Sequence, residues 1–214
     1  MQSDVSRVIA VDGEWTLVRQ AGVGHPPLWL SSRSAHSKPQ PSGRWHVEGE
    51  GYAQYLAPHE DASWAEHVRR SGVRTEDERR HFLLRLWRMR VTERRIADLS
   101  TFDRIEESGL EPARFVDDDH AYCRHLAAAL GDSGFRGVLA PSAAHPGAVN
   151  FTLFGSRREC KMGEQSPRPD HYIPCQLIAD RAVPPPHVLD ITRYRGEPHL
   201  GLYEWEAGKR AKAA

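Results

Sequence analysis

The sequence has few cysteines and no long apolar run, and each absence excludes a class of protein. Its three cysteines form no Cys-x-x-Cys pair, so we expect neither a disulfide-bonded secreted scaffold nor a zinc ribbon. No apolar stretch reaches the roughly 18 residues of a membrane span, and Asp4 and Arg7 interrupt the N-terminal segment where a signal peptide would be apolar. The sequence therefore predicts a cytoplasmic protein with reduced thiols and no membrane association.

Metal-binding patterns are also missing. The twelve histidines show neither His-x-x-x-His nor His-Glu-x-x-His spacing, and they are not paired with cysteines at zinc-finger distances. We expect no metal.

The chain has no excess charge, because 29 basic side chains balance 29 acidic ones, and 25 of the basic residues are arginine. Locally the charge is uneven. Residues 79–95 hold seven arginines against one glutamate, and residues 102–120 hold seven acidic residues against two arginines. The blocks can neutralise each other, or they can face a partner, including a second copy in a homodimer. Without a basic surface overall, an aromatic RNA-binding pattern or a helix-turn-helix, we expect no direct nucleic-acid binding.

The remaining composition is that of a soluble globular chain, with 39% hydrophobic residues in 214. Strands are expected at residues 7–10, 15–19, 52–57, 87–91, 137–140 and 149–154. Helices are expected at residues 61–70, from 75 onward, at 100–109 and at 117–130. Many short strands with few helices predict an α+β fold and not a doubly wound parallel sheet.

Several boundaries rest on single residues. Asp12-Gly13 predicts a turn between the first two strands, and Gly72 predicts the end of the first helix, whose cap would be Asp61 or Ser63. Further helix starts are expected at a capping box from Thr75, at Ser100 and at 117–119. Beyond residue 157 we expect irregular chain, with strands near Leu189 and Tyr203.

Five residues lie in short stretches that could carry chemistry. They are Arg19 at a strand end, Arg44 in Gly-Arg-Trp, Tyr55 in a strand, Glu66 in Trp-Ala-Glu, and Ser142 after Pro141. Together these are the groups that an enzyme acting on the glycosidic bond of a dinucleotide would need. Arginines hold pyrophosphate through forked hydrogen bonds, and a tyrosine ring stacks on a flat nicotinamide. A carboxylate binds a ribose hydroxyl and stabilises an oxocarbenium-like transition state, and a serine hydroxyl can bond to the amide or the ribose.

Each of these residues also has a purely structural interpretation. Ser63 and Glu66 fit a capping box, in which Glu66 would bond only to the start of its helix. Tyr55 fits a strand core, and Arg44 fits an ordinary turn. Ser142 is outside any Gly-x-Ser-x-Gly elbow, so it is poorly suited to be a hydrolase nucleophile.

The order of the motifs resembles the RES domain family, which is named for its Arg, Glu and Ser. The resemblance covers residues 14–158, and it implies a catalytic domain over 1–158, with 159–214 as an extension packed on it or facing a partner. The stretches that carry it are Arg19, Gly43-Arg44-Trp45, Tyr55-Leu56-Ala57, Trp64-Ala65-Glu66, Asp98-Leu99-Ser100, 139–144 and 150–154.

The resemblance implies a split, mostly antiparallel β-structure with flanking helices, similar to ADP-ribosyltransferases. It also implies that Arg19 and Arg44 hold the phosphates of NAD⁺, that Tyr55 packs on nicotinamide, and that Glu66 and Ser142 are catalytic. Arg33 is the alternative to Arg19 as the match for the first arginine of the family. At two positions the sequence departs from the family pattern, since Gln20 and His46 replace a tyrosine and an asparagine found in some members.

For function, the resemblance implies a bacterial toxin that cleaves the nicotinamide–ribose bond of NAD⁺ with water or phosphate, and an Xre-like antitoxin as its partner. Two alternatives stay open. One is a protein ADP-ribosyltransferase that uses the same site. The other is a non-catalytic interaction module, which the departures at Gln20 and His46 motivate.

Overall fold

Strand β3 (Leu84–Asp98) is the centre of the sheet, because it pairs with three other strands. The computed structural model describes residues 4–30, 39–164 and 171–213. In it, β1 (Ala10–Gly22) runs antiparallel along almost the whole length of β3. On the opposite edge of β3, β7 (Tyr172–Ala182) pairs antiparallel with its first half, and β4 (Gly137–Pro141) pairs parallel with its last residues.

The sheet curls back on itself. Its order is β2-β5-β4-β3-β7-β6, where the further strands are β2 (Ala53–Leu56), β5 (Val149–Phe154) and β6 (Arg158–Lys161). The two backbone hydrogen bonds between Val18 and Ala57, at 2.7 and 3.0 Å, join β1 to the chain just after β2. Most of the strand pairings, this bridge included, are antiparallel. The bridge places the end of β1 beside the end of β2, and the candidate site lies there.

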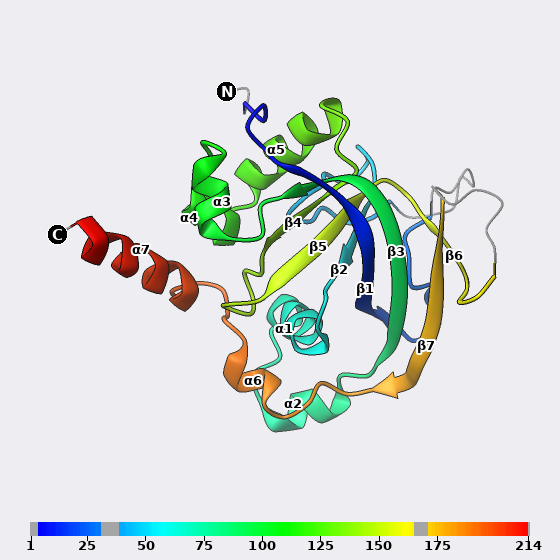
Figure 1. Cartoon of the computed structure of the whole chain (residues 1–214). Helices are drawn as coiled ribbons and strands as arrows, with labels where there is room; N and C mark the ends of the chain where they lie inside the picture. The colour runs from blue at the N-terminus through cyan, green and yellow to red at the C-terminus, as the bar shows by residue number, and fades with distance from the viewer. Residues whose placement is uncertain (1–3, 31–38, 165–170, 214) are drawn as a thin grey trace.

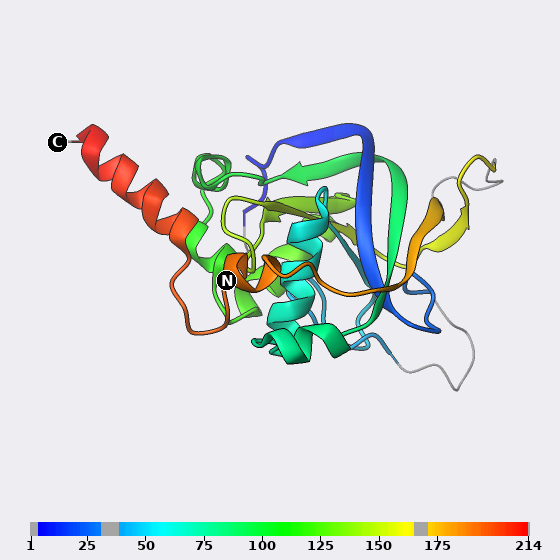
Figure 2. The same cartoon turned by 90° about the horizontal axis from the view of Figure 1, so that it is seen from below.

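Helix α1 lies in the curve of the sheet, where β1 and β3 bend around it (Figure 1). The helices are α1 (Glu60–Ser71), α2 (Glu76–His81), α3 (Phe102–Glu107), α4 (Pro112–Val116), α5 (Ala121–Asp132), α6 (Val188–Ile191) and α7 (Leu200–Ala213). Helix α7 lies at the edge of the protein in both views (Figures 1 and 2), where the Trp205 indole donates to Asp103 of α3 at 2.7 Å. Among the described residues, no helix is long and apolar enough to cross a membrane.

Separate apolar clusters hold the layers together. Leu17, Met89 and Phe151 are buried inside the curled sheet. On the side of α3 to α5, Phe115 and Leu126 belong to a second buried cluster. A third cluster contains Trp64, Val68, Val188 and Tyr194, so the C-terminal segment packs directly on α1.

The predicted α+β class with a mostly antiparallel sheet is confirmed. The predicted strand at 149–154 matches β5, and the left-handed Gly72 ends α1 as expected, with φ 71°. The capping box at Thr75 is present, since its hydroxyl accepts from the Glu78 amide while the Glu78 side chain accepts from the Thr75 amide. Arg88 and Arg90 point outward from β3, as the alternation indicated.

The expected turn at Asp12-Gly13 is wrong. The strand predicted at 15–19 is part of β1, which has a bulge at Asp12, whereas only Ala10 of the strand predicted at 7–10 belongs to β1, because residues 6–7 form a turn. The Asp12 carboxylate accepts a hydrogen bond of 2.9 Å from the backbone of Arg95 on the facing strand, and Arg95 takes up the irregularity with a φ of +53°. The sequence signal of a turn therefore marks a β-bulge.

Helix starts were partly mispredicted. Helix α1 begins at Glu60, earlier than predicted, and its N-cap residue His59 makes no side-chain cap. Ser63 lies inside the helix, and its hydroxyl donates to Gln20 on β1. Thr101, not Ser100, caps α3. Helix α5 begins at Ala121, whose amide donates to Asp119.

The expected irregular tail is also wrong. Strands β6 and β7 extend the sheet, and the segments around Leu189 and Tyr203 are helices α6 and α7. Helix α6 is a single turn, in which the amides of Asp190 and Ile191 donate to the His187 carbonyl. Helix α7 is rich in the strong helix formers Glu, Ala, Lys and Arg. The division of the chain at residue 158 stays a prediction, although β7, which lies beyond it, pairs with β3.

Candidate active site

Glu66 and Ser142, which are 76 positions apart, meet through a hydrogen bond. The Ser142 hydroxyl donates to Glu66 Oε1 at 2.8 Å, and the side-chain amide of Asn150 donates to the same oxygen at 2.6 Å. Glu66 comes from α1, Ser142 follows β4, and Asn150 lies on β5. With two donors on Oε1, the carboxylate is held in one orientation, and Oε2 makes no hydrogen bond among the described residues.

The capping-box interpretation of Glu66 is wrong. Because α1 begins at Glu60, Glu66 lies one turn too far along the helix to reach its free amides. Ser63, the other half of that box, is buried against β1 through Gln20. The carboxylate of Glu66 is thus available to interact with Ser142 and Asn150.

The hydroxyl of Ser142 uses its whole hydrogen-bonding capacity inside the protein. It donates to Glu66 and accepts from the backbone amides of Ala144, at 3.3 Å, and His145, at 3.0 Å. A serine hydroxyl has one donor and two acceptor positions. The side chain is also fully buried, with 0% exposure. This arrangement favours Ser142 as a residue that positions Glu66 over Ser142 as a nucleophile.

Tyr55 positions the turn that carries Arg44. Its hydroxyl accepts from the Trp45 amide at 2.9 Å and lies 3.0 Å from Nδ1 of His46. A Cβ at Gly43 would overlap the same hydroxyl, so only glycine fits there. From this turn, Arg44 reaches the Phe115 carbonyl at 2.9 Å. Burial raises the pKa of the Tyr55 phenol, so the ring is neutral.

Arg19 lies at the bridge that closes the sheet. One of its guanidinium nitrogens donates to the Tyr55 carbonyl at 3.2 Å. Burial lowers the pKa of Arg19 to about 10, and the charge of the nearby Arg70 acts in the same direction. The side chain therefore remains a cation at neutral pH. Arg33, the alternative to Arg19, lies outside the described residues.

Two histidines lie in a positively charged environment near these groups. Burial lowers the pKa of His67 to about 4, and Arg19 and Arg70 add to the effect. Burial likewise lowers the pKa of His120 to about 4, where the added charges are those of Arg44, Arg124, Arg195 and Arg69. Both rings are neutral at pH 7. Arginines from several separate segments thus surround the predicted site, which suits a ligand with several negative charges.

The predicted residues therefore form two groups. Glu66 and Ser142 make one, and Arg19, Tyr55 and Arg44 make the other, with no hydrogen bond between the groups among the described residues. Electrostatics connects them, because Arg44 acts on both Tyr55 and Arg69, and Glu66 acts on Arg69. No cluster of three potential metal ligands occurs in the described chain.

The family model of the RES domain matches residues 16–177, which is well over half of the 214 residues. The chain belongs to the RES domain family. All five predicted site residues lie inside the matched region of the RES domain, and residues 178–214 lie beyond it.

Two mycobacterial proteins are similar to this RES domain. One is a protein of Mycobacterium tuberculosis named probable NAD(+) phosphorylase, 33% identical over 115 residues, which are 52% of this chain and 53% of that protein. The matched region spans about half the length of this curated relative. The other is a chain of the crystal structure of the M. tuberculosis MbcT–MbcA toxin–antitoxin complex. It has a TM-score of 0.57 and 24% identity, and the match covers 85% of this chain and 91% of that one.

The two departures from the family pattern have structural roles in this RES domain. The Gln20 side chain is buried and accepts from Ser63, which ties β1 to α1. His46 contacts the Tyr55 hydroxyl and helps to hold the Gly-Arg-Trp turn. Both residues therefore support the site from its surroundings.

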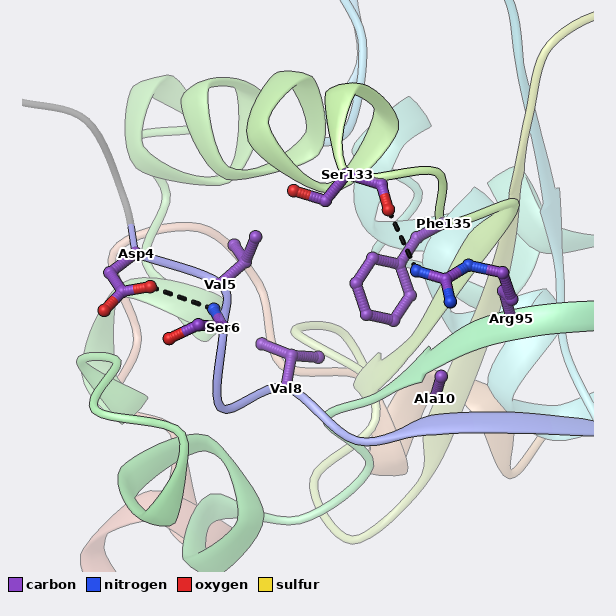
Figure 3. Close-up of a pocket in the computed structure, with 8 residues that line it drawn as sticks. All are labelled: Asp4, Val5, Ser6, Val8, Ala10, Arg95, Ser133 and Phe135. Atoms are coloured by element: carbon purple, nitrogen blue, oxygen red, sulfur yellow. Dashed lines mark hydrogen bonds between the residues drawn. The ribbon is translucent and has the colours of Figure 1, made fainter.

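Two sizeable cavities lie elsewhere. One of about 580 Å³ lies between the N-terminal segment and the end of α5, where Arg95 donates to the Ser133 carbonyl (Figure 3). The other, of about 570 Å³, is lined by residues of α7 and of the chain from α3 to α4. Neither is lined by any of the five predicted site residues.

Sequence reasoning missed three residues of the site. Asn150 was part of a recognised stretch but had no assigned role, and its contact with Glu66 depends on the pairing of β4 with β5. Arg70 and Arg124 were two of 25 arginines, and nothing local distinguished them. Arg124 Nε donates to the Gly43 carbonyl at 2.8 Å, so it adjoins the turn of Arg44.

Proposed function

We propose that this RES domain is an enzyme that consumes NAD⁺ by cleaving the bond between nicotinamide and ribose. The observation that carries the proposal is the oriented carboxylate of Glu66 in a site surrounded by arginines. The name of the mycobacterial relative, probable NAD(+) phosphorylase, supports the same activity.

In the proposed reaction, the C–N bond between ribose C1″ and the nicotinamide nitrogen breaks, and its electron pair leaves with neutral nicotinamide. An oxygen of water or phosphate bonds to C1″. The products are ADP-ribose and a proton with water, or ADP-ribose 1″-phosphate with phosphate. Positive charge develops on the ribose as the bond breaks, so a fixed carboxylate beside it lowers the barrier.

The proposed roles follow from this charge. Glu66 binds a ribose hydroxyl and stabilises the cation through Oε2, while Ser142 and Asn150 hold Oε1. Arg19 and Arg44 bind the two phosphates, with Arg70 and Arg124 adding to the positive field. Tyr55 presents its ring to nicotinamide while its hydroxyl holds the Arg44 turn.

The test is to incubate the purified protein with NAD⁺, with and without inorganic phosphate, and to follow nicotinamide and the ribose product by chromatography. Nicotinamide release that depends on phosphate identifies a phosphorylase, and release without phosphate identifies a glycohydrolase. Label transferred from NAD⁺ to protein would favour an ADP-ribosyltransferase instead. A folded protein with no turnover under any condition would overturn the proposal.

We also propose that the enzyme is the toxin of a bacterial toxin–antitoxin pair, acts in the cytoplasm, and is held inactive by an Xre-like antitoxin. The similarity to a chain of a toxin–antitoxin complex supports this. Induced expression in a bacterial host should arrest growth and deplete NAD⁺, and the Glu66→Gln variant should do neither. Equal growth arrest by both proteins would contradict a toxicity that depends on catalysis.

A further inference from the structure

The segment 193–199 lies outside the matched region of the RES domain, yet it contacts the loop that carries Ser142. Three consecutive carbonyls of that loop each accept a hydrogen bond from it. The His199 ring lies 3.0 Å from the Ser142 carbonyl, Arg193 Nη1 donates to the Ala143 carbonyl at 3.2 Å, and the Arg193 amide donates to the Ala144 carbonyl at 2.7 Å.

The hydrogen bonds of His199 define which nitrogen carries its proton. The backbone amide of Leu202 donates to Nδ1 at 3.1 Å, so Nδ1 is the acceptor. The proton of the neutral ring is therefore on Nε2, which donates to the Ser142 carbonyl. The ring is buried, packs edge-on against Phe102, and has its pKa lowered by burial. It is thus a fixed neutral donor.

The segment itself is firmly anchored. The Arg193 guanidinium also donates to the Val116 carbonyl at 3.0 Å, and the Gly196 amide donates to Asp118 at 2.7 Å. Asp118 also pairs with Arg69, whose guanidinium donates to the same Ala143 carbonyl. The Tyr194 hydroxyl donates to the Val73 carbonyl behind α1 at 2.8 Å. These contacts join α1, which carries Glu66, to the loop that carries Ser142.

We infer that residues 193–199 are a positioning element of the active site, in which His199 and Arg193 hold the Ser142 loop so that its hydroxyl orients Glu66. The effect on turnover rests on the proposed function. The effect on the loop does not, because it concerns only the contacts of the protein with itself.

The decisive variant is His199→Phe, which keeps an aromatic ring against Phe102 and removes both hydrogen bonds of the imidazole. We expect kcat for NAD⁺ cleavage to fall about 10-fold while KM changes less than about 3-fold, because a displaced Glu66 affects the transition state more than binding. His199→Gln, whose amide can reach the Ser142 carbonyl, should recover most of the loss. Tyr203→Ala, on the exposed face of α7, is the matched control and should equal the parent.

A second readout does not depend on catalysis. Hydrogen–deuterium exchange of a peptide spanning residues 142–148 should be faster in His199→Phe than in the parent and in Tyr203→Ala. If His199→Phe does not fold, Arg193→Met, which removes the side-chain contacts and keeps the backbone bond to Ala144, takes its place. Unchanged exchange in the loop, or full kcat in a folded variant, would overturn the inference. An inactive parent would overturn the proposed function, and the exchange result would still decide whether the segment holds the loop.

Discussion

The hydroxyl of Ser142 donates to Glu66 and is itself held by two backbone amides, so the serine is bound to the carboxylate with all of its hydrogen-bonding positions filled. This relationship separates two residues that the family resemblance groups together as catalytic. Within the part of the chain that the structure describes, Glu66 has an oxygen left for a ligand, and Ser142 has no hydrogen-bonding capacity left.

Replacement of Glu66 by glutamine should nearly abolish turnover. The amide keeps the shape of the side chain and loses the negative charge that stabilises the ribose cation, so we expect kcat to fall by about 10²–10³-fold with little change in NAD⁺ binding. Single-turnover kinetics with isothermal titration measures both. Glu60→Gln, at the exposed start of α1, is the control. Retention of more than a tenth of the parent kcat would contradict the role of Glu66.

Ser142→Ala should lower turnover without abolishing it. Asn150 still holds Glu66, so we expect kcat to fall about 10-fold, whereas loss of a nucleophile would remove turnover entirely. The variant also leaves two backbone amides without their acceptor, which should cost about 1–3 kcal/mol of folding free energy, measurable by urea unfolding. Turnover as low as that of Glu66→Gln would contradict the positioning role.

Arg44→Ala should act mainly on binding. Loss of a charged hydrogen bond to phosphate costs about 1.5–3 kcal/mol, which is a rise in the NAD⁺ dissociation constant of roughly 10- to 150-fold. Arg88→Ala, an exposed arginine of β3, is the control of equal charge change. Equal affinity of Arg44→Ala and the parent for NAD⁺ would remove Arg44 from the phosphate site.

Gly43 and Tyr55 should be energetically coupled. Gly43→Ala puts a methyl group against the tyrosine hydroxyl, and Tyr55→Phe leaves the Trp45 amide without its acceptor. Each change should lower the free energy of unfolding by about 1–3 kcal/mol, but the double variant should lose less than the sum, because the phenylalanine relieves part of the clash. A double-mutant cycle by chemical denaturation measures the coupling, and strict additivity would contradict the contact.

Stability should fall in mild acid because of His67 and His120. The folded protein holds both pKa values at about 4, below their ordinary value of 6.5, so the unfolded chain takes up more protons between these limits. Their contribution to stability is therefore complete above about pH 7 and is lost as the pH falls from about 6.5 towards about 4. Thermal unfolding from about pH 8 to about pH 4.5 should show a smaller loss for His67→Gln than for the parent. An equal loss in both would mean that His67 titrates normally.

Local sequence was enough for the features that depend on neighbouring residues. The capping box at Thr75, the end of α1 at Gly72 and the outward arginines of β3 each depend on a few adjacent side chains, and all are found. The ordered short motifs also identified the family and the five candidate site residues, because each motif consists of a few adjacent residues that are recognisable without the fold.

The contacts between those residues depend on the fold. Glu66 meets Ser142 because the curled sheet brings the end of β4 to α1, and Arg19 meets Tyr55 because one bridge closes β1 onto β2. Long-range pairing also explains why Asp12-Gly13 forms a bulge where the local sequence predicts a turn. In the same way, the C-terminal tail forms two strands and two helices and contacts the Ser142 loop. Hydrogen bonds between segments far apart in the chain leave no pattern in the local sequence, so only the folded chain shows them.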